Sequence, residues 1–149
     1  MSLKDRITED MKTALRSGAR ERLSTVRLIL AAIKQREVDE RITLDDAQVL
    51  AVLEKMVKQR REAIAQFQSG GRADLVAKES AEVAVLQEFM PAQLTAAEVD
   101  ALIQEAIRAT GAASIKDMGK VMAAVKAQAA GRTDMGALSG RIKQLLSGG

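Results

Sequence analysis

The side chains that could do chemistry in this chain are carboxylates, amines, guanidinium groups and hydroxyls, because its 149 residues include no His, Cys, Trp or Tyr. Imidazole and thiolate groups supply most general bases and covalent nucleophiles at neutral pH, and they are the usual zinc ligands. Catalysis that depends on those groups is therefore excluded. The composition favours an interaction protein, whose charged residues would select its partner.

Ser139 and Lys143 are spaced to meet on one turn of a helix, as in a serine–lysine catalytic pair. The lysine of such a pair must be buried so that its pKa falls, and a basic terminal helix does not provide that environment. Glu79 and Glu82 could also meet on a helical face, but solvated surface carboxylates are commoner than acid–base dyads. We therefore predict no catalytic residues.

Two glycine-containing segments approach known motifs but lack required residues. Gly119–Lys120 resembles the end of a phosphate-binding P-loop, but Ser114 and Val121 stand where that motif needs Gly and Ser or Thr. Gly136–Gly140 places its serine one position too late for a nucleophile elbow. The spacing of an EF-hand does not occur, although the sequence does not exclude a metal site made of carboxylates alone. The sequence thus predicts no cofactor and no metal-binding residues.

Positive charge is concentrated near the C-terminus. The net charge is +3 overall, made up of +1 in residues 1–90, −2 in residues 91–110 and +4 in residues 111–149. The last segment carries six cations, Lys116, Lys120, Lys126, Arg132, Arg141 and Lys143. Such clusters attract phosphate backbones through counterion release. On composition alone, the alternative of an ordinary solvated surface is favoured.

A second basic pattern consists of Arg20, Arg27, Lys34 and Arg41, which recur every seven residues. This spacing places the four close to one side of a helix about 30 Å long, where they could follow a phosphate backbone. Acidic residues surround them, and Lys34 with Glu37 has the spacing of an intrahelical ion pair. Structural pairing is the favoured interpretation of this row.

Glycines, the proline and capping residues divide the chain into about seven helical segments, and no window alternates as a strand would. We therefore expect an all-α protein. The expected helices span about residues 3–17, 19–40, 44–69, 72–89, 96–110, 115–130 and 134–146. Four are predicted to start at capping pairs, Ser2 with Asp5, Thr43 with Asp46, Thr95 with Glu98, and Ser114 with Asp117. The third is expected to bury Ala47, Leu50, Leu53, Val57, Ile64 and Phe67.

Pro91 marks the expected domain boundary, because proline lacks an amide hydrogen and disfavours helix in the residue before it. Residues 1–90 are predicted to form an N-terminal helical domain resembling a four-helix bundle. Residues 91–149 are predicted to form a small three-helix C-terminal domain.

The chain carries no apolar run long enough for a membrane span, since the longest, Leu28–Ile33, has six residues. The N-terminus enters a charged amphipathic segment without an apolar signal region. The absence of cysteine fits a reducing compartment. We therefore expect cytoplasmic residence and no membrane partner.

Seven short segments closely resemble the GatB/YqeY family. They are Thr25–Arg27, Lys58–Arg61, Gly71–Arg72, Phe89–Leu94, Asp117–Met122, Gly131–Asp134 and Ile142–Leu146. The resemblance spans nearly the whole chain. It implies a small, helical, bacterial protein with a helical N-terminal bundle. It also implies a C-terminal domain similar to the tail of the B subunit of glutamyl/aspartyl-tRNA amidotransferase.

In that amidotransferase the tail engages tRNA, so the resemblance implies tRNA as a partner, together with an aminoacyl-tRNA amidotransferase or synthetase. Carried over position by position, a tRNA-contact role is implied for Lys116, Lys120, Arg132, Arg141 and Lys143. The family label of a carbon–nitrogen ligase with glutamine as amido-N donor reflects the shared tail, because the kinase and amide-transfer chemistry resides in parts that this chain lacks. Relatives often show a basic or glycine-rich stretch where this chain has Ala123–Ala130, which weakens the predicted surface.

Three hypotheses follow. The leading one is a non-catalytic, tRNA-associated module related to the glutamine-dependent amidotransferase. The alternative is a protein-interaction adaptor with no direct RNA contact. The third is a genuine amidotransferase, which would have to turn over glutamine, ATP and misacylated tRNA without another protein.

Overall fold

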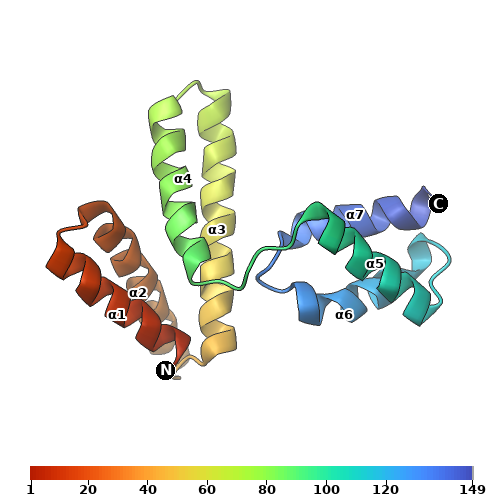
Figure 1. Cartoon of the computed structure of the whole chain (residues 1–149), viewed down its shortest axis with the longest axis horizontal. Coiled ribbons are helices and arrows are strands. Elements are labelled where there is room, and N and C mark those ends of the chain that lie inside the picture. The colour runs from red at the N-terminus through yellow and green to blue at the C-terminus, as the bar shows by residue number, and fades with distance from the viewer. Residues whose placement is uncertain (149) are drawn as a thin grey trace. The chain divides into compact units, whose positions relative to one another are not determined.

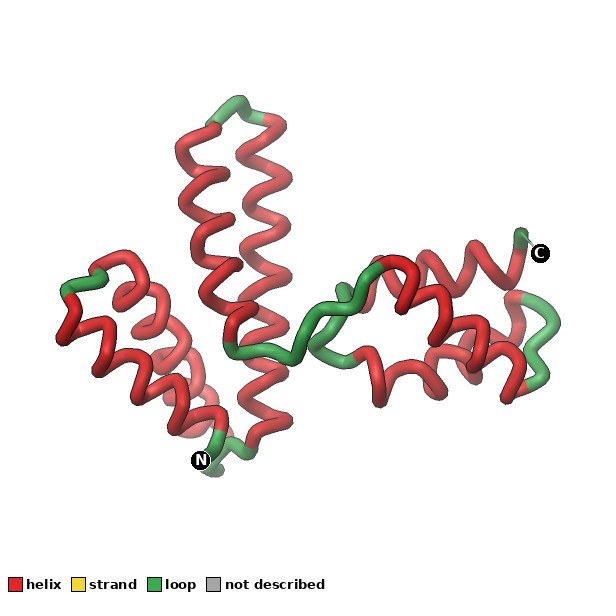
Figure 2. Tube along the Cα trace, viewed as in Figure 1, coloured by secondary structure: helices red, strands yellow, loops and turns green. Residues whose placement is uncertain are grey.

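The computed structural model describes residues 1–148, and over that range the chain contains helices and no strand (Figures 1 and 2). The α-helices are α1 (Leu3–Ser17), α2 (Arg20–Glu40), α3 (Asp46–Ser69), α4 (Ala73–Glu88), α5 (Ala96–Thr110), α6 (Met118–Ala129) and α7 (Met135–Ser147). A single 3₁₀ turn, η1 (Ile115–Asp117), precedes α6. The prediction of an all-α protein is confirmed.

Local capping chemistry sets several helix ends as expected. Ser2 and Asp5 form a reciprocal capping box at the start of α1, and Thr95 and Glu98 form another at the start of α5. Gly18 ends α1 in the left-handed conformation, with φ 73°, which glycine adopts without steric cost.

The predicted cap of the third helix is wrong, because Asp45 and not Thr43 is the N-cap of α3. The Asp45 carboxylate accepts the amide of Gln48 at 2.8 Å, and the Gln48 side chain accepts the amide of Asp45 at 2.9 Å. Asp46 makes a tertiary contact, since its carboxylate accepts the amide of Leu3 at 2.9 Å. A bond across 43 residues thus shifts the start of the helix.

The predicted helix start at Ser114 also needs correction. The predicted capping pair of Ser114 with Asp117 forms, but it caps the 3₁₀ turn η1, and the α-helix begins only at Met118. The Asp117 carboxylate accepts the amide of Ala113 at 2.9 Å and that of Ser114 at 3.3 Å. These two bonds hold the chain in a tight turn before α6 can begin.

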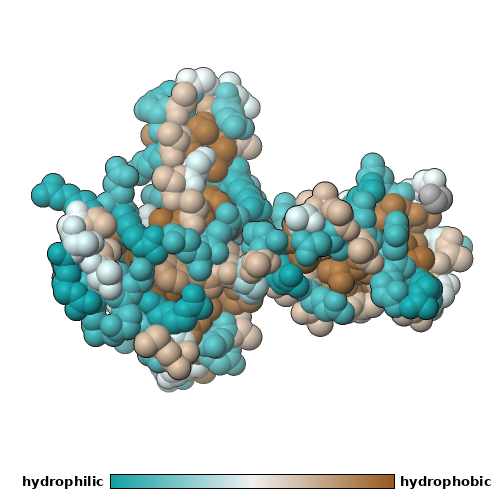
Figure 3. Space-filling model, in the orientation of Figure 1, coloured by the Kyte–Doolittle hydropathy of each residue, from teal (hydrophilic) through white to brown (hydrophobic). Residues whose placement is uncertain are grey.

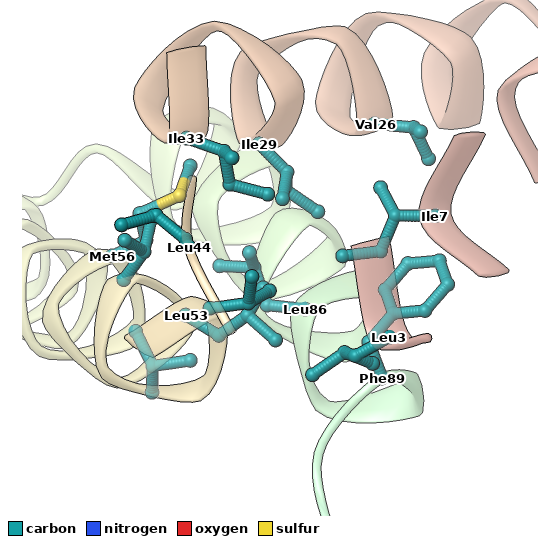
Figure 4. Close-up of a cluster of buried hydrophobic side chains, with 13 residues drawn as sticks. Leu3, Ile7, Val26, Ile29, Ile33, Leu44, Leu53, Met56, Leu86 and Phe89 are labelled. Carbon is teal, nitrogen blue, oxygen red and sulfur yellow. The ribbon is translucent and has the colours of Figure 1, made fainter. Parts of the chain in front are cut away.

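The chain forms two compact units, Met1–Met90 and the residues from Pro91 onward. In the first unit, α1 and α2 form one antiparallel hairpin and α3 and α4 form another (Figure 1). Their shared core includes Ile7, Ile29, Leu53 and Leu86, each fully buried, and these side chains converge in Figure 4.

The core face of α3 differs from the expectation. The residues of α3 that are buried are Val49, Val52, Leu53, Met56 and Val57. Ile64 and Phe67 are only partly covered, because the distal part of the α3–α4 hairpin extends past the α1–α2 hairpin (Figure 1). Figure 3 shows hydrophobic residues along this hairpin between hydrophilic ones. The four helices therefore pack together over only part of their length.

The second unit packs α5, α6 and α7 around Ile103, Val121, Val125, Leu138 and Ile142, all nearly or fully buried. The α6 and α7 helices run antiparallel and are joined by a short connection (Figure 1). No helix among the described residues is long and apolar enough to cross a bilayer.

Arg41 follows the last turn of α2 in the left-handed conformation, with φ 56° and ψ 45°. A non-glycine residue pays roughly 1–2 kcal/mol for this conformation. We expect Arg41→Gly to stabilise the chain by about 0.5 kcal/mol, because the loss of a helix-terminal charge and the greater freedom of unfolded glycine offset part of the gain. Urea denaturation should show a higher midpoint than for the wild-type chain. A lower midpoint would show that the arginine side chain contributes more than its backbone conformation costs.

Candidate nucleic-acid interface

The five cations implied to contact tRNA fall into two groups in the structure. Lys116 and Lys143 are exposed, and within residues 1–148 no carboxylate lies at ion-pair distance from either. Lys120 is 68% exposed and stands 4.0 Å from Asp117. The Ala113 and Ser114 amides are the main cause of the lowered pKa of Asp117, and Lys120 is a minor one. The Lys120 amine is therefore available to another anion.

These three lysines lie at one end of the second unit. Lys116 is in η1 and Lys120 is in the first turn of α6. Lys143 is in the C-terminal half of α7, and η1 contacts α7. Because α6 and α7 run antiparallel, the beginning of α6 and the end of α7 meet at the same end (Figure 1). We call Lys116, Lys120 and Lys143 the tail lysines.

Arg141 is not part of this group, because its guanidinium is already bound. Its Nε and one terminal nitrogen donate to the two carboxylate oxygens of Asp100 at 2.7 and 2.8 Å, and the other donates to Gln144 at 2.9 Å. Arg141 and Lys143 are two positions apart on α7 and so point about 200° apart around the helix. Arg141 therefore fastens α7 to α5.

Arg132 is also bound within the second unit. It donates to the carbonyl oxygen of Ala92 at 3.1 Å and to that of Gln128 at 3.4 Å. Its own carbonyl accepts the amide of Leu94 at 2.7 Å, and the Gln93 side chain donates to Gly131 at 2.9 Å. These bonds attach the segment before α5 to the α6–α7 connection, which gives Arg132 a structural role.

Lys126 is a cation that the sequence-based site assignment missed. It is exposed in the last turn of α6, and no carboxylate among the described residues lies at ion-pair distance from it. The resemblance offered no motif around it, since it lies in the alanine-rich segment Ala123–Ala130. The sequence feature that could have identified Lys126 as a free cation is the absence of acidic residues near it.

The Asp100–Arg141 pair predicts a pH-dependent stability. The Arg141 hydrogen bond holds the pKa of Asp100 below its ordinary value of 3.8, so the pair stabilises the fold above that pH and loses this effect as pH falls through the lower folded-state pKa. We expect Asp100→Asn to lower the melting temperature at pH 7, and the difference from wild type to shrink at about pH 3. Glu105→Gln removes an exposed pair within α5 and serves as the control, with a smaller effect at pH 7. An equal loss at both pH values would contradict this assignment.

Glu79 with Glu82 and Ser139 with Lys143 are the pairs of side chains that the sequence spacing suggested for catalysis. Glu82 pairs with Arg60 at 3.0 Å. The pKa of Glu79 is raised, first by burial and then by Glu82. Lys143 is exposed, so the Ser139–Lys143 pair lacks the buried lysine that nucleophilic catalysis requires. Among residues 1–148, no three His, Cys, Asp or Glu side chains group so that they could hold a metal ion.

Comparison with known proteins gives a family match over almost the full length. A family model described as "Yqey-like protein" matches residues 4–146. Several curated relatives carry the name "Altered inheritance of mitochondria protein 41, mitochondrial", among them the proteins of three fungi. The one from Eremothecium gossypii is 36% identical over 106 residues, covering 66% of this chain and 58% of the relative. The one from Kluyveromyces lactis is 34% identical over 100 residues, covering 65% and 54%. The one from Pyrenophora tritici-repentis is 31% identical over 129 residues, covering 83% and 71%. The chain thus spans little more than half the length of the first two relatives.

Two expectations are corrected by these relatives. They are fungal proteins, so the expectation of a bacterial family was wrong. Their names describe them as mitochondrial, which contradicts the expectation of cytoplasmic residence. The expectation of cytoplasmic residence rested on the lack of an apolar signal region and of cysteine, and neither feature separates the cytoplasm from an organelle interior.

Proposed function

Because the chain belongs to the YqeY-like protein family, we propose that it is a non-catalytic RNA-binding module that contacts tRNA through its second unit. The resemblance of this unit to the tail of the amidotransferase B subunit supports tRNA as the ligand. We further propose that it acts beside an aminoacyl-tRNA amidotransferase or synthetase, which would supply the chemistry.

The observation that carries this proposal is the exposure of the tail lysines without strong carboxylate partners. An exposed ammonium group that is not held by a carboxylate can replace the counterions of a phosphate backbone at little cost. Arg141 keeps its bonds to Asp100, and Arg132 keeps its bonds to Ala92 and Gln128, while the tail lysines bind RNA. The second unit thus separates cations that hold the fold from cations that can meet a ligand.

The experiment is a comparison of tRNA affinity between the wild-type chain and the triple variant Lys116→Ala, Lys120→Ala, Lys143→Ala. We expect at least about a tenfold loss at low salt, and a salt-dependence slope shallower by about three, because three phosphate contacts are removed. Circular dichroism should show unchanged helix content, since alanine is a good helix former.

The matched control is Lys12→Ala, Arg72→Ala, Arg108→Ala, which removes the same charge from exposed cations paired with neighbouring carboxylates. Its tRNA affinity should stay within about threefold of wild type, since only the general field changes. Equal affinities for the tail triple variant and this control would overturn the proposal. A wild-type chain that binds no tRNA at low salt would do so as well, and would favour the protein-interaction adaptor.

A further inference from the structure

The outward face of α2 carries Arg20, Arg27, Lys34 and Arg41, which we call the α2 cation row. All four are exposed. Seven residues advance about 10.5 Å along a helix and rotate about 20° short of two full turns around its axis. The row is therefore nearly straight and about 30 Å long. The buried side of the same helix contains Val26, Ile29 and Ile33. The row therefore faces away from the core of the first unit.

The members of the row are free of ion pairs among the described residues, whereas several other cations of the first unit are paired with carboxylates. Lys4, Arg22, Arg36 and Arg60 each pair with a carboxylate at 2.5–3.0 Å. Within residues 1–148, no carboxylate lies at ion-pair distance from any cation of the row. The prediction that structural pairing explains the row is wrong.

Three of the four carboxylates of α2, those of Glu37, Asp39 and Glu40, are engaged by groups outside the row, and the fourth, that of Glu21, directly follows Arg20. Glu37 binds the Lys4 amine at 2.8 Å and accepts the Leu44 amide at 3.0 Å. These bonds are the main causes of its lowered pKa, and Lys34 acts on it only at long range. Asp39 accepts from Gln35 at 2.9 Å, and Glu40 accepts from Arg36 at 2.5 Å. The expected Lys34–Glu37 pair is thus replaced by a tertiary pair, which leaves Lys34 available.

Small or uncharged residues separate the cations along the same side of the helix. Ser24, Ala31 and Val38 lie between successive members, at the three- and four-residue spacing of one helical face. At the C-terminal end, Lys34 and Arg41 line a shallow hollow of ≈ 370 Å³ together with Thr43 and with Glu37, whose carboxylate is bound to the Lys4 amine. The row therefore presents positive charge with space between its members for an anionic group.

The backbone of Arg41 supplies an independent observation. This residue holds a left-handed conformation that glycine would adopt at lower cost. A residue kept in a strained conformation suggests a use for its side chain. Here that side chain completes the row at the end of α2.

Three classes of anionic partner fit the row less well than a double helix does. A membrane-surface helix needs a continuous apolar face to insert. The apolar face of α2 formed by Val26, Ile29 and Ile33 is buried in the core, and its exposed large apolar side chains, Leu28 and Val38, lie ten positions apart. A protein partner would normally pack on aromatic or methionine residues, and none lies between the cations. Single-stranded RNA is held by stacking on aromatic side chains, and the two phenylalanines of the chain lie outside α2.

We propose that the α2 cation row binds the phosphate backbone of double-helical RNA, as a contact surface in addition to the tail lysines. A duplex presents a regular line of phosphates, which a straight row of fixed cations about 30 Å long can follow without reading bases. This inference rests on the proposed function and narrows it to the paired regions of a structured RNA.

The test measures binding of a 5′-labelled RNA duplex of about 16 base pairs, and of a single strand of equal length, to the full chain. The row variant Arg20→Ala, Arg27→Ala, Lys34→Ala should bind the duplex about tenfold more weakly than the wild-type chain. The slope of its log affinity against log salt concentration should be shallower by about three. The control variant Lys12→Ala, Arg72→Ala, Arg108→Ala, which removes the same charge, should bind the duplex with nearly wild-type affinity. Arg41→Gly should lose affinity by a smaller factor even though it stabilises the fold. That combination separates RNA contact from folding.

Each outcome decides between the two proposals. If the tail triple variant loses affinity and the row variant matches the control, this inference fails and the proposed function stands. If the wild-type chain binds neither tRNA nor duplex at low salt, both fail. Equal affinity for duplex and single strand overturns the choice of double-helical RNA, and binding to anionic lipid vesicles without binding to duplex assigns the row to a membrane surface.

Discussion

Raising the salt concentration from 50 to 200 mM should weaken tRNA binding by about 1,000-fold. Each phosphate contact that releases a counterion steepens the logarithmic salt slope by about 0.9, and about six contacts give this loss over a fourfold change in salt. The tail lysines and the α2 cation row together offer enough free cations for these contacts. Fluorescence anisotropy with labelled tRNA across this range gives the slope directly.

The control for this prediction is folding stability over the same range of salt. The exposed ion pairs of the chain, such as Lys12–Glu9, contribute little to stability, so the melting temperature should change by only a few degrees. A slope shallower than about −1 would mean that fixed cations are not the main contacts, and would contradict the electrostatic account.

Leu53→Ala should lower the free energy of unfolding of the first unit by about 3 kcal/mol. Leu53 is fully buried on α3, and Figure 4 shows it beside Leu86 of α4, beneath α2. Removing three carbon atoms there forfeits their transfer free energy and leaves a cavity that packed helices fill poorly. Urea denaturation followed by circular dichroism measures the loss.

Leu15→Ala is the matched control, because Leu15 is 56% exposed and the same atoms are removed. Its effect should stay within about 0.5 kcal/mol. A loss at Leu53 no larger than the loss at Leu15 would show that the two hairpins do not pack around this residue, and the α2 cation row would then lack a fixed support.

Local rules predicted the features that depend on neighbouring residues. The capping boxes at Ser2 and Thr95 need only residues three positions apart, and the helix end at Gly18 needs only the tolerance of glycine for positive φ. These expectations are confirmed. They are confirmed because nothing distant competes for the same amides.

The expectations that failed concern residues whose surroundings are set by distant parts of the chain. The Glu37 carboxylate binds Lys4, 33 positions away, and so does not pair with Lys34 on its own helix. Arg141 binds Asp100, 41 positions away, which no local pattern reveals. Ile64 and Phe67 continue the apolar period of α3 but lie where the α3–α4 hairpin extends past α1 and α2. Charge and periodicity in the sequence indicate which cations could bind a ligand and which apolar residues could be buried. The tertiary fold determines which of those cations are unpaired and which of those apolar residues are covered.

Contact between RNA and the fixed cations can be measured by lysine acetylation of the full chain with and without tRNA, read residue by residue by mass spectrometry. Saturating tRNA should slow acetylation of Lys116, Lys120, Lys143 and Lys34 severalfold, because bound phosphates shield these amines from the reagent. Lys12, which pairs with Glu9, should react at the same rate in both samples and serves as the internal control. Unchanged rates at the tail lysines under saturating tRNA would contradict the claim that these fixed cations form the RNA contact.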